Sequence, residues 1–139
     1  MNITNQLFEH AEIAKLAKDI NTPLSYYQTA DYLNGRLRYC LSDFEKDLPS
    51  KISILESSGN LILSTIKKSE SRMGYIIRLY NASAKNNVTE KLVFTQSIKK
   101  VELVNLLENK IEEKHIKNKT VIIKNVKPAE FISVYVEFG

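Results

Sequence analysis

The chain is poor in the residues that mark disulfide-bonded, metal-binding and phosphate-binding proteins. Cys40 is its single cysteine, so no intrachain disulfide can form, and a reducing compartment is expected. The two histidines, His10 and His115, have no acidic or cysteine partner at the spacing of a metal site. The four glycines form no phosphate-cradling pattern. We therefore predict no disulfide framework, no metal or cofactor site and no phosphate-binding loop in this chain.

Long apolar runs are also missing, and none approaches the ~20 residues that a membrane-spanning helix needs. The first six residues lack the basic-then-apolar layout of a signal peptide, so we expect a cytoplasmic protein without a membrane partner. The net charge of +4 comes mainly from lysines that are scattered among glutamates. Nucleic-acid binders more often gather their basic residues on one face, so no nucleic-acid partner is expected.

What is present suffices for one domain, since 139 residues with 43% apolar content can bury a core. Apolar residues at helical spacing predict one helix over about residues 5–20, which ends before Pro23. Residues 1–50 are predicted to be this helix and a lead-in segment, and residues 51–139 a β-sandwich. Together they are expected to form one structural domain.

The lead-in holds a turn signal, Asn34-Gly35, between two short stretches, 24–28 and 36–41, that could be strands. It also carries four of the seven tyrosines. These side chains either cover the edges of the core or stack on sugar rings, and the sequence leaves both readings open. The four residues are Tyr26, Tyr27, Tyr32 and Tyr39.

After Pro49 the chain reads as a succession of strands with period-two alternation and polar turns. This pattern predicts an all-β fold, an antiparallel β-sandwich with one N-terminal helix. The predicted strands are 51–56, 61–66, 75–80, 88–94, 99–107, 120–123 and 132–138. The residues expected to be buried are Ile52, Ile54, Ile77, Leu79, Leu92, Phe94, Ile132, Val134 and Val136.

Residues 58–81 predict a β-hairpin, with two apolar runs around a polar loop that ends in glycine. Its charged residues are either a substrate-facing or domain-docking set, or cross-strand ion pairs that fix the hairpin. Arg78 interrupts an apolar strand, so it lies on the wet face or binds a carboxylate at a domain interface. The set comprises Lys67, Lys68, Glu70, Arg72 and Arg78.

Two acidic clusters raise the question of paired catalytic carboxylates, which glycosidases use. Both lie in polar segments that we expect to be solvated loops, whereas catalytic carboxylates are held in enclosed sites. The first cluster is Asp43, Glu45 and Asp47, and the second is Glu108, Glu112 and Glu113. No catalytic residue is therefore predicted.

The hairpin also carries a family resemblance. Residues 64–70, Gly74 and the Arg-Leu-Tyr-Asn of 78–81 resemble the signature of the C-terminal β-domain of the α-mannosidases of glycoside hydrolase family 38. Weaker similarities are found at 10–11, at 21–24, at 30–36, which has the look of bacterial members, and at Lys127-Pro128-Ala129-Glu130-Phe131.

The resemblance implies a parent enzyme that is a retaining α-mannosidase dependent on zinc or another divalent metal. Its catalytic Asp and metal ligands lie in a larger N-terminal region, and no residue of this chain matches them. We expect a non-catalytic C-terminal domain whose partners are the remaining domains, and which self-associates through a truncated face when they are missing. The alternatives are a stand-alone carbohydrate-binding module, in which Tyr26, Tyr27 and Tyr32 stack on a mannoside, and a protein-interaction domain without sugar contact.

Overall fold

The computed structural model describes residues 13–22, 32–33, 37–38 and 52–139. These ranges contain one helix, α1 (Ile13–Asn21), and a small antiparallel pair of strands, β1 (Tyr32–Leu33) and β2 (Leu37–Arg38). No helix in them is long and apolar enough to cross a membrane. The main body consists of β3 (Leu55–Ser57), β4 (Ile62–Lys68), β5 (Tyr75–Tyr80), β6 (Val88–Phe94), β7 (Ile98–Val104), β8 (Lys110–Glu113), β9 (Thr120–Val126) and β10 (Phe131–Phe138).

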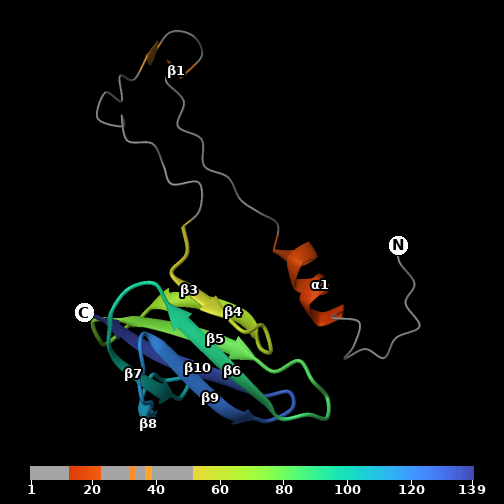
Figure 1. The fold of residues 1–139 in the computed structure, drawn as a ribbon. Coiled ribbons are helices and arrows are strands. Elements are labelled where there is room, and N and C mark those ends of the chain that lie inside the picture. The colour runs from red at the N-terminus through yellow and green to blue at the C-terminus, as the bar shows by residue number, and fades with distance from the viewer. Residues whose placement is uncertain (1–12, 23–31, 34–36, 39–51) are drawn as a thin grey trace.

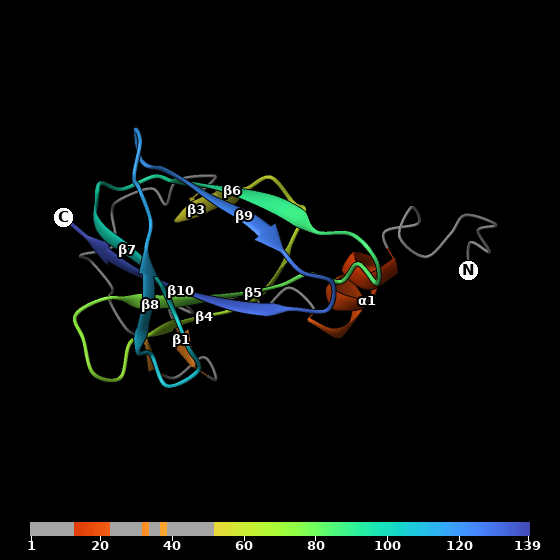
Figure 2. The same ribbon diagram turned by 90° about the horizontal axis from the view of Figure 1, so that it is seen from below.

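The strands of the main body form two antiparallel sheets that pack face to face as layers (Figures 1 and 2). The large sheet has the order β4-β5-β10-β7-β8, and the small sheet has the order β3-β6-β9. All pairings are antiparallel. The predicted all-β sandwich with one helix is confirmed.

The core lies between the two sheets, where alternate residues of the paired strands other than β8 face inward. Six of the nine residues predicted to be buried are confirmed, and Ile132 is half-buried against the same cluster. The prediction that Ile52 and Ile54 are buried was wrong, because they are 84% and 55% exposed. Both precede β3, which begins only at Leu55, so no strand pairing turns them toward the core. The six confirmed residues are Ile77, Leu79, Leu92, Phe94, Val134 and Val136.

The predicted bounds of β5 and β6 are those of the structure. Strand β8 was missed because all its side chains are exposed, and only backbone pairing with β7 defines it. The helix was predicted from about residue 5, but the residues before Ile13 lie outside the described ranges, as does the predicted strand 24–28. Within 36–41, the structure describes β2, which pairs back onto β1.

Glu90 of β6 is buried and binds the chain segment that passes from β3 in the small sheet to β4 in the large sheet. It is fully buried, and its Oε1 accepts hydrogen bonds from the Ser57 hydroxyl and from the Ser58 amide and hydroxyl, at 2.7–2.9 Å. Its Oε2 accepts a bond of 2.8 Å from the Leu61 amide. A buried carboxylate needs such donors to offset its lost hydration. Glu90 therefore holds the chain where it passes from β3 to β4.

The burial pattern generates a stability prediction. Truncating Leu92, which is fully buried, should lower the free energy of unfolding by about 2–5 kcal/mol, because the Leu92→Ala change leaves a cavity in the close-packed core. The exposed control, Ile52→Ala, should change it by less than about 0.5 kcal/mol. Urea unfolding followed by far-UV circular dichroism measures both, and equal losses would contradict the described core.

Candidate functional site

The candidate site lies on the outer face of the large sheet, the face turned away from the small sheet. Two loops meet there: residues 69–74, which join β4 to β5, and residues 105–109, which join β7 to β8. In Figure 2 both loops project from the side of the large sheet that is remote from β6 and β9. Since Ile77 and Leu79 face the core, period-two alternation turns Ile76, Arg78 and Tyr80 to this outer face.

Glu102 of β7 is the centre of the site, and it is 0% exposed. Its Oε2 accepts a bond of 2.5 Å from the Arg72 guanidinium, and its Oε1 lies 2.8 Å from the Lys100 ammonium and 3.3 Å from that of Lys110. Burial alone raises the pKa of this carboxyl, but the hydrogen bonds from the three cations outweigh burial and lower the pKa to about 2. Glu102 is therefore ionised and paired with three internal cations.

Arg72 links Glu102 to the hairpin loop. Its guanidinium carbon lies 3.8 Å from the centroid of the Tyr135 ring, and its Nη2 donates a bond of 3.0 Å to the backbone carbonyl of Glu108. The hydroxyl of Tyr135 donates to the carbonyl of Met73 at 2.9 Å, and burial raises its pKa. Tyr135 of β10 thus holds the backbone of the 69–74 loop, and the Arg72 guanidinium packs over the ring of Tyr135.

The glycine at the end of the hairpin loop makes this close approach possible. A Cβ on Gly74 would lie 2.6 Å from the carbonyl oxygen of Val136 and 2.7 Å from ring carbons of Tyr135. Neither a strand carbonyl nor a buried ring can retreat at low cost. The space around Gly74 therefore requires a residue without a side chain.

Glu108 is the second buried carboxylate of the site, with a side chain that is 5% exposed. It lies 2.8 Å from the Lys67 ammonium and accepts bonds of 2.6 Å from the Ser69 hydroxyl and 3.0 Å from the Glu70 amide. The bonds from Lys67 and Ser69 lower its pKa to about 2. The prediction that Glu108 lies in a solvated loop was therefore wrong, because its side chain is buried.

The reason for the error is a turn in the 105–109 loop. Asn105 Oδ1 accepts hydrogen bonds from the amides of Leu107 and Asn109, and Glu108 has a φ of 63°. This turn places Glu108 among the donors of the hairpin. Glu112 and Glu113 are exposed, as predicted, but they lie on strand β8 and not in a loop. Asp43, Glu45 and Asp47 lie outside the described residues.

Some charged residues of the hairpin form internal ion pairs, and others have no ion pair within the described residues. Lys67 pairs with Glu70 and with Glu108, so it bridges the hairpin and the neighbouring loop, whereas Lys68 has no ion pair within the described residues. Arg78 is half-buried between Thr65 and Ser133 in the register of the sheet. Its Nε is buried and has no hydrogen-bond partner among the described residues.

The predicted sugar-stacking tyrosines are not brought to this site. Tyr26, Tyr27 and Tyr39 lie outside the described residues, and Tyr32 is described only as the first residue of β1. A different aromatic pair lies on the outer face. Tyr80 and Phe131 stack with ring centroids 4.4 Å apart, and Phe131 is 61% exposed.

Sequence reasoning missed Glu102 and Tyr135, the two residues on which the site is built. The available signal was a charged residue inside an apolar strand, Val101-Glu102-Leu103-Val104, the same signal that singled out Arg78. Its partner Arg72 lies 30 residues away in the chain, so spacing alone could not pair them.

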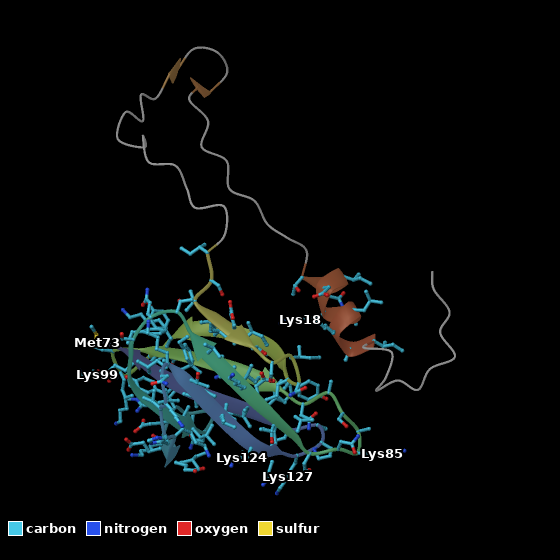
Figure 3. The ribbon with its side chains drawn as sticks, viewed as in Figure 1. Lys18, Met73, Lys85, Lys99, Lys124 and Lys127 are labelled. Carbon is cyan, nitrogen blue, oxygen red and sulfur yellow. The ribbon has the colours of Figure 1, made fainter. Side chains whose placement is uncertain are left out.

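The arrangement is suited to holding loops rather than to proton transfer. A general acid needs a raised pKa, whereas both buried carboxylates have lowered values. Within the described ranges, no three His, Cys, Asp or Glu side chains are grouped so that they could hold a metal ion. The site rigidly presents the hairpin loop, whose exposed Met73 lies at the end of the sandwich remote from Lys85 (Figure 3).

The lowered pKa values predict an acid-dependent stability. An unperturbed glutamate titrates near 4.5, so Glu102 and Glu108 contribute stability above this pH, and the contribution is lost as the pH falls from about 4.5 to about 2. Glu102→Gln should lower the free energy of unfolding by about 3 kcal/mol at pH 7, because it leaves the cations without their buried partner. The deficit should shrink across the same pH window.

Denaturant unfolding at stepped pH values measures this prediction. Glu113→Gln is the matched control, because its exposed ion pair with Lys110 should change stability by less than about 0.5 kcal/mol. A Glu102→Gln deficit that is constant between pH 7 and pH 2 would refute the assigned ionisation.

The crowding at Gly74 gives a further prediction. Gly74→Ala should lower the free energy of unfolding by about 1–3 kcal/mol, because the added carbon overlaps Val136 and Tyr135. Met73→Ala next to it should change the same quantity by less than about 0.5 kcal/mol, since Met73 is exposed. Thermal unfolding of both variants provides the test, and a neutral Gly74→Ala would mean that the loop is not held against β10.

Comparison with known proteins gives this region a family. The model of the glycosyl hydrolases family 38 C-terminal beta sandwich domain matches residues 60–134, which include both strands of the hairpin, Glu102 and Glu108. No curated protein matches the chain. The match covers more than half of the sequence and agrees with the resemblance of the hairpin. The chain therefore belongs to the glycosyl hydrolase family 38 C-terminal β-sandwich domains.

Proposed function

We propose that this chain is the non-catalytic C-terminal β-domain of a bacterial, cytoplasmic family 38 α-mannosidase, which stabilises the enzyme and braces its active-site region. The observation that carries the proposal is the family match over 60–134, a span in which the hairpin is fixed by two buried, cation-bound carboxylates. Such a hairpin suits a rigid contact with a neighbouring domain.

In this proposal the hydrolysis of α-linked mannose takes place elsewhere in the parent enzyme. A retaining glycosidase needs a nucleophile and an acid with a raised pKa, and Glu102 and Glu108 do not supply that acid. The described residues also do not fit a site for zinc or another divalent metal. We therefore assign both the metal and the catalytic carboxylates to other domains of the parent.

Two features of the described chain support docking to those domains. Arg78 is half-buried on the outer face and has no ion pair within the described residues, so its guanidinium is available to a carboxylate of a neighbouring domain. Helix α1 has a strongly one-sided apolar face, but none of its residues is buried. With the partner domains absent, this face would favour self-association of the chain.

The proposal predicts that the purified chain does not hydrolyse an aryl α-mannoside, with or without added zinc. The physical reason is that its buried carboxylates are held ionised by Lys67 and Arg72. Release of nitrophenol from 4-nitrophenyl α-mannoside measures the activity. Zinc-dependent turnover that one carboxylate substitution in this chain abolishes would overturn the proposal.

A second candidate function, a stand-alone carbohydrate-binding module, is supported by the Tyr80–Phe131 pair. Exposed aromatic rings stack on the apolar faces of sugars, and Arg78 and Ser133 lie on the same face of the sheet as donors. In this alternative the ligand is a neutral mannoside. The lead-in residues Tyr26, Tyr27 and Tyr32 remain predicted stacking residues.

Isothermal titration of the chain with mannopentaose separates the two functions. The leading proposal predicts no measurable heat of binding by the isolated chain. Binding that Phe131→Ala abolishes and Met73→Ala preserves would establish the module instead, because only Phe131 belongs to the aromatic pair.

A further inference from the structure

Among the described residues, some basic side chains form ion pairs and others do not. On the large sheet, lysines and Arg72 face carboxylates, as in Lys67–Glu108, Arg72–Glu102 and Lys99–Glu137. Lys91, Lys117 and Lys124 have no ion pair within the described residues. These three line one groove of about 710 Å³ beside β6, β8 and β9.

We propose that this groove binds an anionic oligosaccharide that carries phosphate or sulfate groups. The carboxylates of the groove do not cancel its lysines, because the lining holds four lysines and two glutamates, and Glu112 pairs with Lys114, the fourth lysine, at 2.7 Å. The ammonium groups of Lys91, Lys117 and Lys124 are therefore left to attract a ligand.

The fold brings these lysines together from separate elements. Lys91 on β6 is directly opposite Ile122 on β9, and Lys124 lies two residues beyond Ile122 on the same face. Lys117 comes from the turn before β9, where Asn118 and Lys119 have φ values of 48° and 60°. That tight turn pairs Lys117 with Thr120 and returns the chain to the groove. Figure 3 labels Lys124 near β9.

The lining is compatible with a substituted sugar chain. Ile122 is 48% exposed and offers an apolar floor, while Thr120 and Asn118 offer hydrogen-bonding groups. Lysines act as point charges toward phosphate and sulfate, and the volume is that of a site for a short oligomer. No Phe, Tyr or Trp side chain lines the groove, so the stacking platform that single-stranded nucleic acids use is missing from it.

Binding by the full chain can be measured with two probes, a sulfated heparin hexasaccharide and a phosphorylated mannopentaose. Unmodified mannopentaose serves as the neutral reference. The test variant carries Lys91→Gln, Lys117→Gln and Lys124→Gln. The control variant makes the same change in net charge outside the groove, with Lys68→Gln, Lys85→Gln and Lys127→Gln. Circular dichroism of both variants verifies that they are folded.

We expect the wild type and the control to bind at least one charged probe, and the test variant to bind it about tenfold more weakly or not at all. The affinity should fall as the salt concentration rises. Preference for one probe identifies the phosphate or sulfate ester as the recognised group. Equal losses in the two variants, equal affinity for a nucleic-acid duplex, or no binding of either charged probe would overturn the proposal. None of these outcomes bears on the mannosidase assignment, which is tested at the hairpin and by activity.

Discussion

The buried carboxylate of Glu102 is the constraint on which the outer face of the large sheet depends. Removing a carboxylate from water costs several kcal/mol, and only close cations with good geometry offset that cost. Arg72, Lys100 and Lys110 supply them from the hairpin loop, from β7 and from the edge strand β8. If any of these elements moved away, charge would be left buried without compensation. The ion cluster therefore fixes two loops and an edge strand that have few apolar contacts of their own.

This constraint explains why the hairpin fits a bracing element better than a reactive centre. Arg72 is engaged by Glu102, by the ring of Tyr135 and by the Glu108 carbonyl, so it has little freedom to meet a substrate. Glu108 is engaged by Lys67 and Ser69 in the same way. Arg78 on the same face has no such internal partner within the described residues. Among the described residues, the outer face thus combines a rigid loop with an arginine that has no ion pair, as a contact surface between domains would.

The sequence predicted the architecture well where local periodicity determines it. Alternation located β5, β6 and β10 and their inward residues, because one face of each strand packs on the core. It failed at Ile52 and Ile54, where apolar alternation continues beyond the paired strand, and at β8, where exposed side chains give no pattern. The site was less predictable. Pairing Glu102 with Arg72, or Glu108 with Ser69, requires contacts between residues 30 and 39 positions apart in the chain, which no local pattern encodes.

The central claim is that Glu102 and Glu108 are structural anions held by internal cations. Carbon-13 NMR titration of the glutamate side-chain carboxyls reports their ionisation directly, with assignments verified by Glu102→Gln and Glu108→Gln. The account predicts that both carboxyls titrate near pH 2, well below exposed glutamates of the same chain. A pKa at or above 4.5 for either one would contradict it, since that carboxyl would then be free to act as an acid and would not lock the hairpin.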